Sequence, residues 1–294
     1  KMSGKRSSCG TGALAVAAVA VVVSIVLTSS RSAGTAQYPG VPSWPEVVLR
    51  GALSSWLRKA ADALVPPANR LLSRAFDLNQ FVSIYCCGKL GWPDVLHNGP
   101  QPGKVLAMHA NMSKIMTRRL LRACVVADIF SEVRISDGEV DDDDRQYINT
   151  VLGDALRSDH PFTMKHSIQL QLEDVSPAMM QFWNTVRNDS MLPFSLAHNY
   201  PHTSQSFYQY FFVDRPAQGV QFNKAMISID ALEVGSLIHD FRWSSKCTSV
   251  IDVGGGRGYF LANLLRKYPN LRGTLFDFPP VIHQAEAYWA EEHG

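Results

Sequence analysis

Two aspartates flank a run of glycines near the end of the sequence. Asp252 closes a β-branched apolar segment, and Gly254, Gly256 and Gly258 follow it in the pattern D-x-G-x-G-x-G, with Asp277 further along. Glycine allows the backbone to turn sharply and to lie directly against a ligand. An acid at the tip of the next strand can accept hydrogen bonds from two ribose hydroxyls. These residues therefore predict a nucleoside-binding site.

The surrounding residues predict the elements that hold this site. Val250, Ile251 and Val253 indicate a buried parallel strand, and 272–278 indicates a second one. Between them lies one apolar helical face: Phe260, Leu261, Leu264 and Leu265. The order strand, glycine turn, helix, strand is that of an α/β sheet with its ligand at the carboxyl ends of the strands.

The glycine spacing distinguishes between two kinds of nucleoside ligand. A dinucleotide fingerprint G-x-G-x-x-G beginning at Gly254 requires a glycine at position 259, where this sequence has Tyr259. An acid at Asp252, beside the ligand's amino group, suits a methionine moiety with its ammonium and suits a pyrophosphate poorly. A methionine-bearing nucleoside is therefore favoured.

The motif DVGGGRG followed by LFDFPPVI resembles the paired signature of class I S-adenosylmethionine-dependent O-methyltransferases of the caffeate, acetylserotonin and hydroxyneurosporene type. Earlier segments resemble successive landmarks of that family: LGWPDVL, RRLLRACVVADIF, LGDALRSDHP, PFSLAH and FNKAM. The resemblance covers nearly everything after Ala60.

The resemblance implies an α/β fold. An N-terminal all-α, winged-helix-like dimerisation domain would precede the first strands of a Rossmann-like methyltransferase domain. S-adenosylmethionine would be the cofactor, contacted by Gly254 and Asp277, with its pocket shaped by Gly256, Gly258 and Asp252.

A predicted helix that precedes the glycine turn in the sequence contains two further residues that match positions of this family. Phe222 and Met226 correspond to family positions beside cofactor and acceptor, although both also suit the core of an apolar helix. Asp230 departs from the family, which usually has serine or an aromatic residue there.

The implied activity is methyl transfer to a hydroxyl of a small, aromatic molecule, in a homodimer that binds no nucleic acid. The family's histidine base belongs to a motif expected beyond Gly294, so the sequence is expected to be C-terminally incomplete and its catalytic base is unknown. A non-catalytic dimerisation or regulatory protein of the same fold is the alternative. A winged-helix DNA-binding protein is a weaker one, because the basic face of the helix at 114–126 suits a plain amphipathic helix.

The N-terminal half is predicted to be mainly helical. Helical spacing from Trp56 to Leu96 is interrupted at Pro66 and Gly91, and 114–126 forms a helix followed by a strand from Phe130. The aspartates at 141–144 suit a solvated wing, and no metal site is predicted.

These observations divide the chain into five segments. A signal peptide or signal anchor occupies 1–36, a linker 37–55, the helical winged-helix dimerisation domain 56–190, connecting helices that line the substrate pocket 191–245, and the truncated cofactor domain 246–294.

The apolar run from Gly12 to Leu27 follows Lys5 and Arg6 and precedes small polar residues. This pattern is typical of a targeting segment. The apolar run is at the long end for the core of a signal peptide and short for a membrane-spanning helix, so both a signal peptide and a short signal anchor remain open. It predicts a chain of the secretory pathway, anchored in a membrane or targeted to an organelle through residues 12–28. Without that segment the chain would be cytoplasmic.

The composition limits the class of ligand that the chain can bind and the redox state expected of its cysteines. A formal net charge of +2 gives no basic surplus for nucleic acid, so the expected ligand is small. The five cysteines show no metal-site spacing, and we expect reduced thiols: Cys9, Cys86, Cys87, Cys124 and Cys247.

Overall fold

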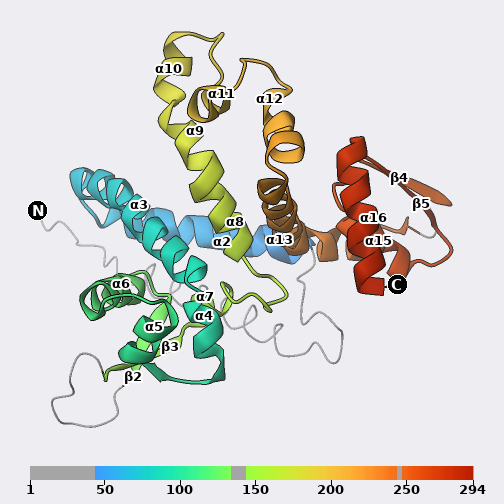
Figure 1. Ribbon diagram of the computed structural model, residues 1–294. Coiled ribbons are helices and arrows are strands. Elements are labelled where there is room, and N and C mark those ends of the chain that lie inside the picture. Colours follow the sequence, from blue (N-terminus) through green and yellow to red (C-terminus); the bar gives the residue numbers. More distant parts are fainter. Residues whose placement is uncertain (1–43, 134–143, 244–246, 294) are drawn as a thin grey trace, which may run out of the picture. The chain divides into compact units, whose positions relative to one another are not determined.

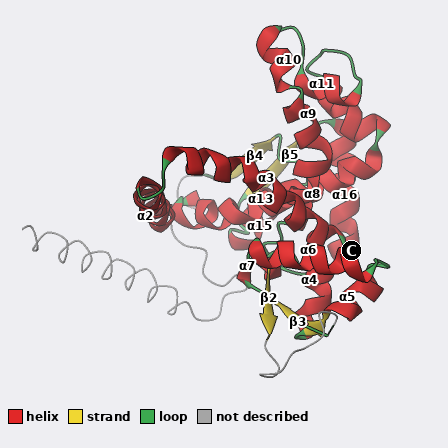
Figure 2. Cartoon of the chain, turned by 90° about the vertical axis from the view of Figure 1, so that its left-hand side faces the viewer, coloured by secondary structure: helices red, strands yellow, loops and turns green. Residues whose placement is uncertain are grey.

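The structure is a computed structural model that describes residues 44–133, 144–243 and 247–293. It contains two compact units. Of the described residues, the first comprises 44–64 with 235–240, and the second comprises 65–133, 144–234, 241–243 and 247–293. Helices make up most of the described chain (Figure 2).

In the first unit, helix α2 spans Trp44–Ala63. It therefore begins inside the segment 37–55 that the sequence predicts as a linker. Pro45 is compatible with this start, because a proline in the first turn removes only a backbone N–H that has no partner within the helix.

The predicted membrane anchor requires a correction. Among the helices in the described ranges, none combines the length and the apolar character needed to cross a bilayer. This finding contradicts the secretory, membrane-anchored localisation and the membrane association that we predicted. The apolar run at 12–28, on which that prediction rested, lies outside the described residues.

The second unit contains α3, Pro67–Lys89, whose N-cap is Pro66 and whose first residue is the second proline of the pair Pro66-Pro67. The chain then turns at Gly91, whose φ of 71° is in the left-handed region, and continues as α4, Trp92–Val95, and the 3₁₀ turn η1, Leu96–Asn98. Both predicted interruptions, at Pro66 and Gly91, are confirmed.

A small antiparallel sheet follows, with its helices. Its elements are β1 Gln101–Pro102, α5 Gly103–His109, α6 Lys114–Val126, β2 Phe130–Val133 and β3 Gln146–Asn149, and the strand order is β1-β3-β2. The Ser113 hydroxyl caps α6 by accepting a hydrogen bond from Met116 N at 3.3 Å. The predicted helix at 114–126 and the strand from Phe130 are confirmed. Of the predicted wing aspartates only Asp144 lies within the described residues.

The apolar sides of α3, α5 and α6 meet in one core with the sheet. Trp92, Leu106 and Leu121 are fully buried there. In this core Cys87 of α3 and Cys124 of α6 form a disulfide, so the prediction of reduced thiols is wrong for this pair. Cys86 and Cys247 are free.

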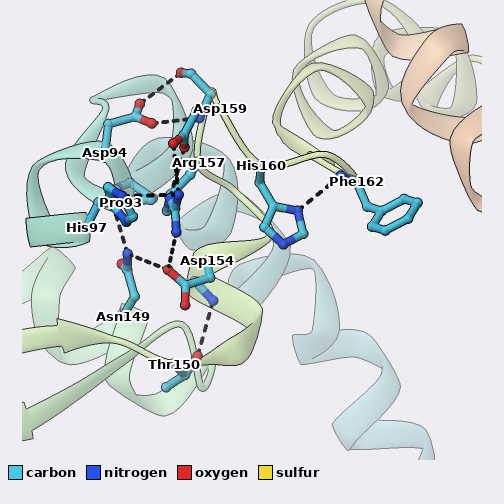
Figure 3. A network of polar contacts seen from close by, with 12 residues as sticks. Pro93, Asp94, His97, Asn149, Thr150, Asp154, Arg157, Asp159, His160 and Phe162 are labelled. Carbon is cyan, nitrogen blue, oxygen red and sulfur yellow. Dashed lines mark hydrogen bonds and ion pairs between the residues drawn. The ribbon is translucent and has the colours of Figure 1, made fainter. Parts of the chain in front are cut away.

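A polar network joins α4 to the segment after β3 (Figure 3). The Arg157 guanidinium donates to Asp159 at 2.9 Å and to Asp154 at 3.3 Å. Asn149 Nδ2 donates to the Pro93 carbonyl at 2.9 Å. The network therefore fixes the landmark segments LGWPDVL and LGDALRSDHP against one another.

Asp94 gives this network a dependence on pH. Its carboxylate accepts hydrogen bonds from Ser158 N at 2.6 Å and from Lys165 Nζ at 3.2 Å. Burial acts to raise the pKa of Asp94, but the hydrogen bonds from Ser158 and Lys165 outweigh it and the pKa is lowered. A carboxyl whose pKa is lowered by folding stabilises the fold above its unfolded-state pKa, and that contribution disappears as the pH falls through its folded-state pKa.

We expect Asp94→Asn to lower the free energy of unfolding by about 1 kcal/mol at neutral pH, since the carboxylate is partly solvent-screened. The difference from wild type should shrink below about pH 4, the usual range of an aspartate. Urea unfolding at several pH values measures it. Exposed Asp189→Asn is the control, and a difference that stays constant down to pH 3 would contradict the assignment.

Helices connect this region to the C-terminal sheet (Figure 1). They are α7 Val151–Asp154, α8 Lys165–Leu170, η2 Gln171–Val175, α9 Ser176–Met180, α10 Phe182–Arg187, α11 Pro193–His198, α12 Ser206–Tyr208, η3 Gln209–Asp214 and α13 Pro216–Asp240. Both η2 and η3 are π-helical. They are joined by a buried contact, in which Tyr210 donates its hydroxyl to Asp174 at 2.6 Å.

The chain ends in a strand-helix-strand-helix unit (Figure 1). Its elements are β4 Ser249–Val253, α15 Tyr259–Lys267, β5 Arg272–Phe276 and α16 Pro279–His293. The strands are parallel, and Val253 pairs with Phe276. On one side of the sheet Leu261 of α15 lies against Gly273 of β5. Apolar residues of both helices are buried: Leu261, Leu264, Val281 and Ala285. The other side of the sheet exposes Ile251, Val253 and Phe276.

Candidate cofactor site

The two strands bring the predicted glycines and Asp277 to one edge of the sheet. Because β4 and β5 are parallel and in register, their carboxyl ends coincide. Gly254 N donates to the Phe276 carbonyl at 2.7 Å, just before Asp277. Gly256 N donates to Asp277 Oδ2 at 2.8 Å, so the glycine turn is held directly by the predicted acid.

The backbone of the turn explains the need for glycine. Gly254, Gly256 and Gly258 have φ values of 74°, 59° and 76°, in the left-handed region that side-chain-bearing residues rarely adopt. The space beside Gly254 and Gly256 where a Cβ would stand is open. The turn thus presents bare backbone, followed by the N-terminus of α15.

Asp252 lies under this turn. A Cβ on Gly255 would overlap its carboxylate, so the two are packed together. Burial and the charge of Asp277 raise the pKa of Asp252. Its Oδ2 is buried and has no hydrogen-bond partner in the described chain. A buried carboxylate oxygen without a partner is costly, and a cationic or donor ligand would satisfy it.

Asp277 has capacity for a ligand as well. It accepts from Gly256 N and, through Oδ1, from Phe278 N at 2.7 Å. An ionised carboxylate offers about four acceptor positions, so two hydroxyl donors can still be accommodated. Two hydroxyls on adjacent carbons, as in a ribose, match this capacity.

Phe222 and Met226 lie on α13, away from the glycine turn in sequence. Phe222 packs on Phe211 with ring centroids 5.0 Å apart, and Met226 packs against the same cluster. This aromatic cluster comprises buried Leu170, Tyr210, Phe211 and Ala225 with the partly buried Val175, Phe194, Tyr200, Phe207, Phe212, Phe222 and Met226. Both residues are partly buried, so they belong to its packing.

Two contacts connect α12 and α13 to the residues that follow the glycine turn in the chain, and the sequence did not indicate either contact. The Tyr208 ring lies 4.9 Å from that of Phe278, the residue after Asp277. Asn223 Nδ2 on α13 donates to Gln284 Oε1 on α16 at 2.6 Å. The aromatic segments therefore adjoin the residues that follow β5, which include Asp277.

His198 and His202 contact residues outside the glycine turn. His198 Nε2 is 2.9 Å from the Asp174 backbone oxygen, and its ring packs against Phe194 with centroids 4.4 Å apart. His202 Nδ1 accepts from Leu192 N at 3.0 Å. In the described segments no three His, Cys, Asp or Glu side chains gather as a metal site.

Bare glycine backbone, a helix N-terminus and a strand-terminal acid together define a nucleoside-binding α/β domain. Two family profiles match the chain. The O-methyltransferase dimerisation domain covers residues 80–159, and the O-methyltransferase domain covers residues 183–294. The chain belongs to this family of S-adenosylmethionine-dependent O-methyltransferases. The regulatory and DNA-binding alternatives are not favoured by these matches.

The similarity of the chain to two named methyltransferases supports this family assignment. The chain is 31% identical to the 8-amino-8-demethylriboflavin N,N-dimethyltransferase of Streptomyces davaonensis, over 77% of this chain and 61% of that protein. It is 25% identical to strychnine O-methyltransferase of Strychnos nux-vomica, over 78% of this chain and 64% of that one.

The solved structure of CalO1, a methyltransferase of calicheamicin biosynthesis in its SAH-bound form, superposes with a TM-score of 0.58 at 26% identity. It covers 74% of this chain and 60% of that one. The chain thus spans less than two thirds of the length of these proteins.

Proposed function

We propose that this chain binds S-adenosylmethionine and takes part in methyl transfer from it to a hydroxyl of a small aromatic molecule. The observation that carries the proposal is the hydrogen bond from Gly256 N to Asp277, at the shared carboxyl edge of β4 and β5. It joins the bare glycine backbone to an acid that has acceptor capacity left for a ribose.

The described residues fit the cofactor. Asp277 would accept the ribose hydroxyls, and the turn from Gly254 to Gly258 would lie against the nucleoside. Asp252, whose buried Oδ2 has no partner, would face the ammonium of the methionine part. The geometry and the donor set therefore match both halves of this cofactor.

When bound, S-adenosylmethionine would supply an electrophilic methyl group on a sulfonium: the acceptor oxygen would bond to the methyl carbon in line as the carbon–sulfur bond breaks, with S-adenosylhomocysteine as the leaving group and the hydroxyl proton passing to a base. This chain's contribution is to position that methyl group and to exclude water. Asp277 and the glycine turn hold the nucleoside end, which determines where the reacting end lies. We assign the catalytic base to none of the described residues.

The acceptor would approach from the side of α13. Phe222 and Met226 form part of the aromatic cluster, and Tyr208 of its neighbouring segment touches Phe278 beside Asp277. A flat aromatic acceptor would pack favourably on such rings. The names of the relatives, for strychnine and a riboflavin derivative, also point to an aromatic acceptor.

Homodimerisation through the N-terminal region is part of the proposal. Every residue from Leu71 to Gln80 of α3 is exposed, including Leu72 and Phe76, which lie four residues apart on one helix face. A helix with this many exposed apolar side chains needs a covering surface. The small sheet with α5 and α6 would be the winged-helix-like part of that dimerisation domain, without a role in DNA binding.

Sedimentation equilibrium tests the dimer. We expect the double variant Leu72→Ser/Phe76→Ser to raise the dimer dissociation constant at least tenfold, because it removes two apolar anchors. Asp77→Ser, on the same exposed turn, is the matched control. A wild-type chain that is monomeric at tens of micromolar would contradict the proposal.

Isothermal titration of the chain with S-adenosylhomocysteine tests the cofactor site, since this product shares the nucleoside and amino-acid parts and does not react. Saturable one-to-one binding supports the proposal. Absence of binding by a chain with a cooperative unfolding transition would refute it. Transfer of labelled methyl from S-adenosylmethionine to a panel of phenols and aromatic amines would then identify the acceptor.

A further inference from the structure

Arg257 is the only residue with a side chain in the turn from Gly254 to Gly258, and it contacts helix α16 in two ways. Its backbone carbonyl accepts a hydrogen bond from Trp289 Nε1 at 2.6 Å. Its guanidinium lies over the Tyr288 ring, 5.1 Å from the ring centroid, where the face of the ring attracts a cation. Two consecutive residues of α16 therefore hold the main chain and the side chain of one turn residue.

The indole of Trp289 is fixed in this position by its neighbours. Its ring packs edge to face with that of Tyr288, with centroids 5.1 Å apart, and the Arg266 guanidinium of α15 lies over it at 5.3 Å. Both aromatic rings are partly buried, and Arg257 is only 9% exposed. An indole N–H can only donate, so in such a packed place it is directed at an acceptor, here the carbonyl of the turn.

The composition of the turn makes such an anchor important. Four of its five residues are glycines, which lose more conformational entropy on ordering than any other residue type. Asp277 holds the turn at Gly256 N, and Trp289 holds it one residue later. A turn that is already ordered before the ligand arrives does not have to be ordered during binding, and this raises the affinity.

We propose that Trp289 is a positioning residue for cofactor binding, which acts through the main chain of Arg257. The inference rests on the proposed function and adds to it a residue of α16, outside the glycine motif and its two acids. Trp289 needs no contact with the ligand in this role. It holds the glycine turn in the conformation that receives the ligand, in both the free and the bound chain.

Trp289→Phe removes the indole donor and keeps an apolar ring. We expect this variant to bind S-adenosylhomocysteine about fivefold more weakly in titration calorimetry, the effect of losing one hydrogen bond. Trp183→Phe, the same chemical change at a side chain that is 67% exposed on α10, should leave the affinity within twofold. Arg257→Met is a second variant, which removes the guanidinium from the Tyr288 ring and should weaken binding about threefold.

Amide hydrogen exchange of the ligand-free chain separates positioning from a general loss of stability. In Trp289→Phe the amides of residues 254–258 should exchange at least fivefold faster, whereas those of β4 should stay within twofold of wild type.

Weaker binding together with this selective change, in a variant with a cooperative thermal transition, supports the proposal. Unchanged affinity, faster exchange that is uniform or absent at the turn, or unfolding of both variants would overturn it and leave the cofactor site in place. If the wild-type chain does not bind S-adenosylhomocysteine, the proposed function itself fails, and this inference fails with it.

Discussion

Replacing Asp277 by alanine is expected to weaken the binding of S-adenosylhomocysteine by at least about 100-fold. The carboxylate would lose two charge-assisted hydrogen bonds to ribose hydroxyls, each worth about 1.5 kcal/mol or more. Since 1.4 kcal/mol corresponds to a tenfold change, the sum exceeds two decades. The substitution also removes the acceptor of Gly256 N, which loosens the glycine turn itself.

Asparagine at the same position separates these two effects. Its carbonyl oxygen can still accept the hydrogen bond from Gly256 N, but it has no charge and fewer acceptor positions for the ribose. We expect Asp277→Asn to lie between wild type and Asp277→Ala, with a loss of about tenfold. Titration calorimetry measures all three chains, with Glu286→Ala on the exposed side of α16 as the control.

A loss below threefold in folded Asp277→Ala would remove Asp277 from the cofactor site. The same titration with methylthioadenosine should show a similar loss, because this nucleoside has the same ribose hydroxyls. Such a pattern would assign the loss to the ribose contacts, because the two ligands share only the nucleoside and its thioether.

The glycine turn and Asp277 could be predicted because local rules determine them. A β-branched run followed by glycines ends one strand, and a second apolar run ends in Asp277. Parallel pairing then brings both ends together without further information. The helix at 114–126 is equally local, since its Ser113 cap and apolar spacing are both contained in the segment.

The remaining features depend on tertiary packing, which spacing does not reveal. Cys87 and Cys124 are 37 residues apart, and they meet only because α3 and α6 share a core. The hydrogen bond from Tyr210 to Asp174 joins two π-helical segments, which have no simple sequence signature. The sequence placed Phe222 and Met226 on one helix but could not identify which residues they contact.

Trp92→Ala is expected to lower the free energy of unfolding by about 3–5 kcal/mol, the range for removing a buried tryptophan. Trp92 is fully buried in the same core cluster as Leu96 and Leu106. Its Nε1 donates to the Leu106 carbonyl at 3.1 Å. The alanine variant therefore leaves a cavity and also an acceptor without its donor.

Urea unfolding at fixed protein concentration measures the loss, with Trp56→Ala as the matched control. The Trp56 side chain is 54% exposed on α2, so the same chemical change there should cost no more than about 0.5 kcal/mol. Trp92→Phe should lie between them, because it keeps most of the apolar volume and loses only the donor. If Trp92→Ala were as mild as Trp56→Ala, the core around α4 would not be the stabilising element that the structure describes. The predicted order of the three variants therefore tests the packing of the segment LGWPDVL directly.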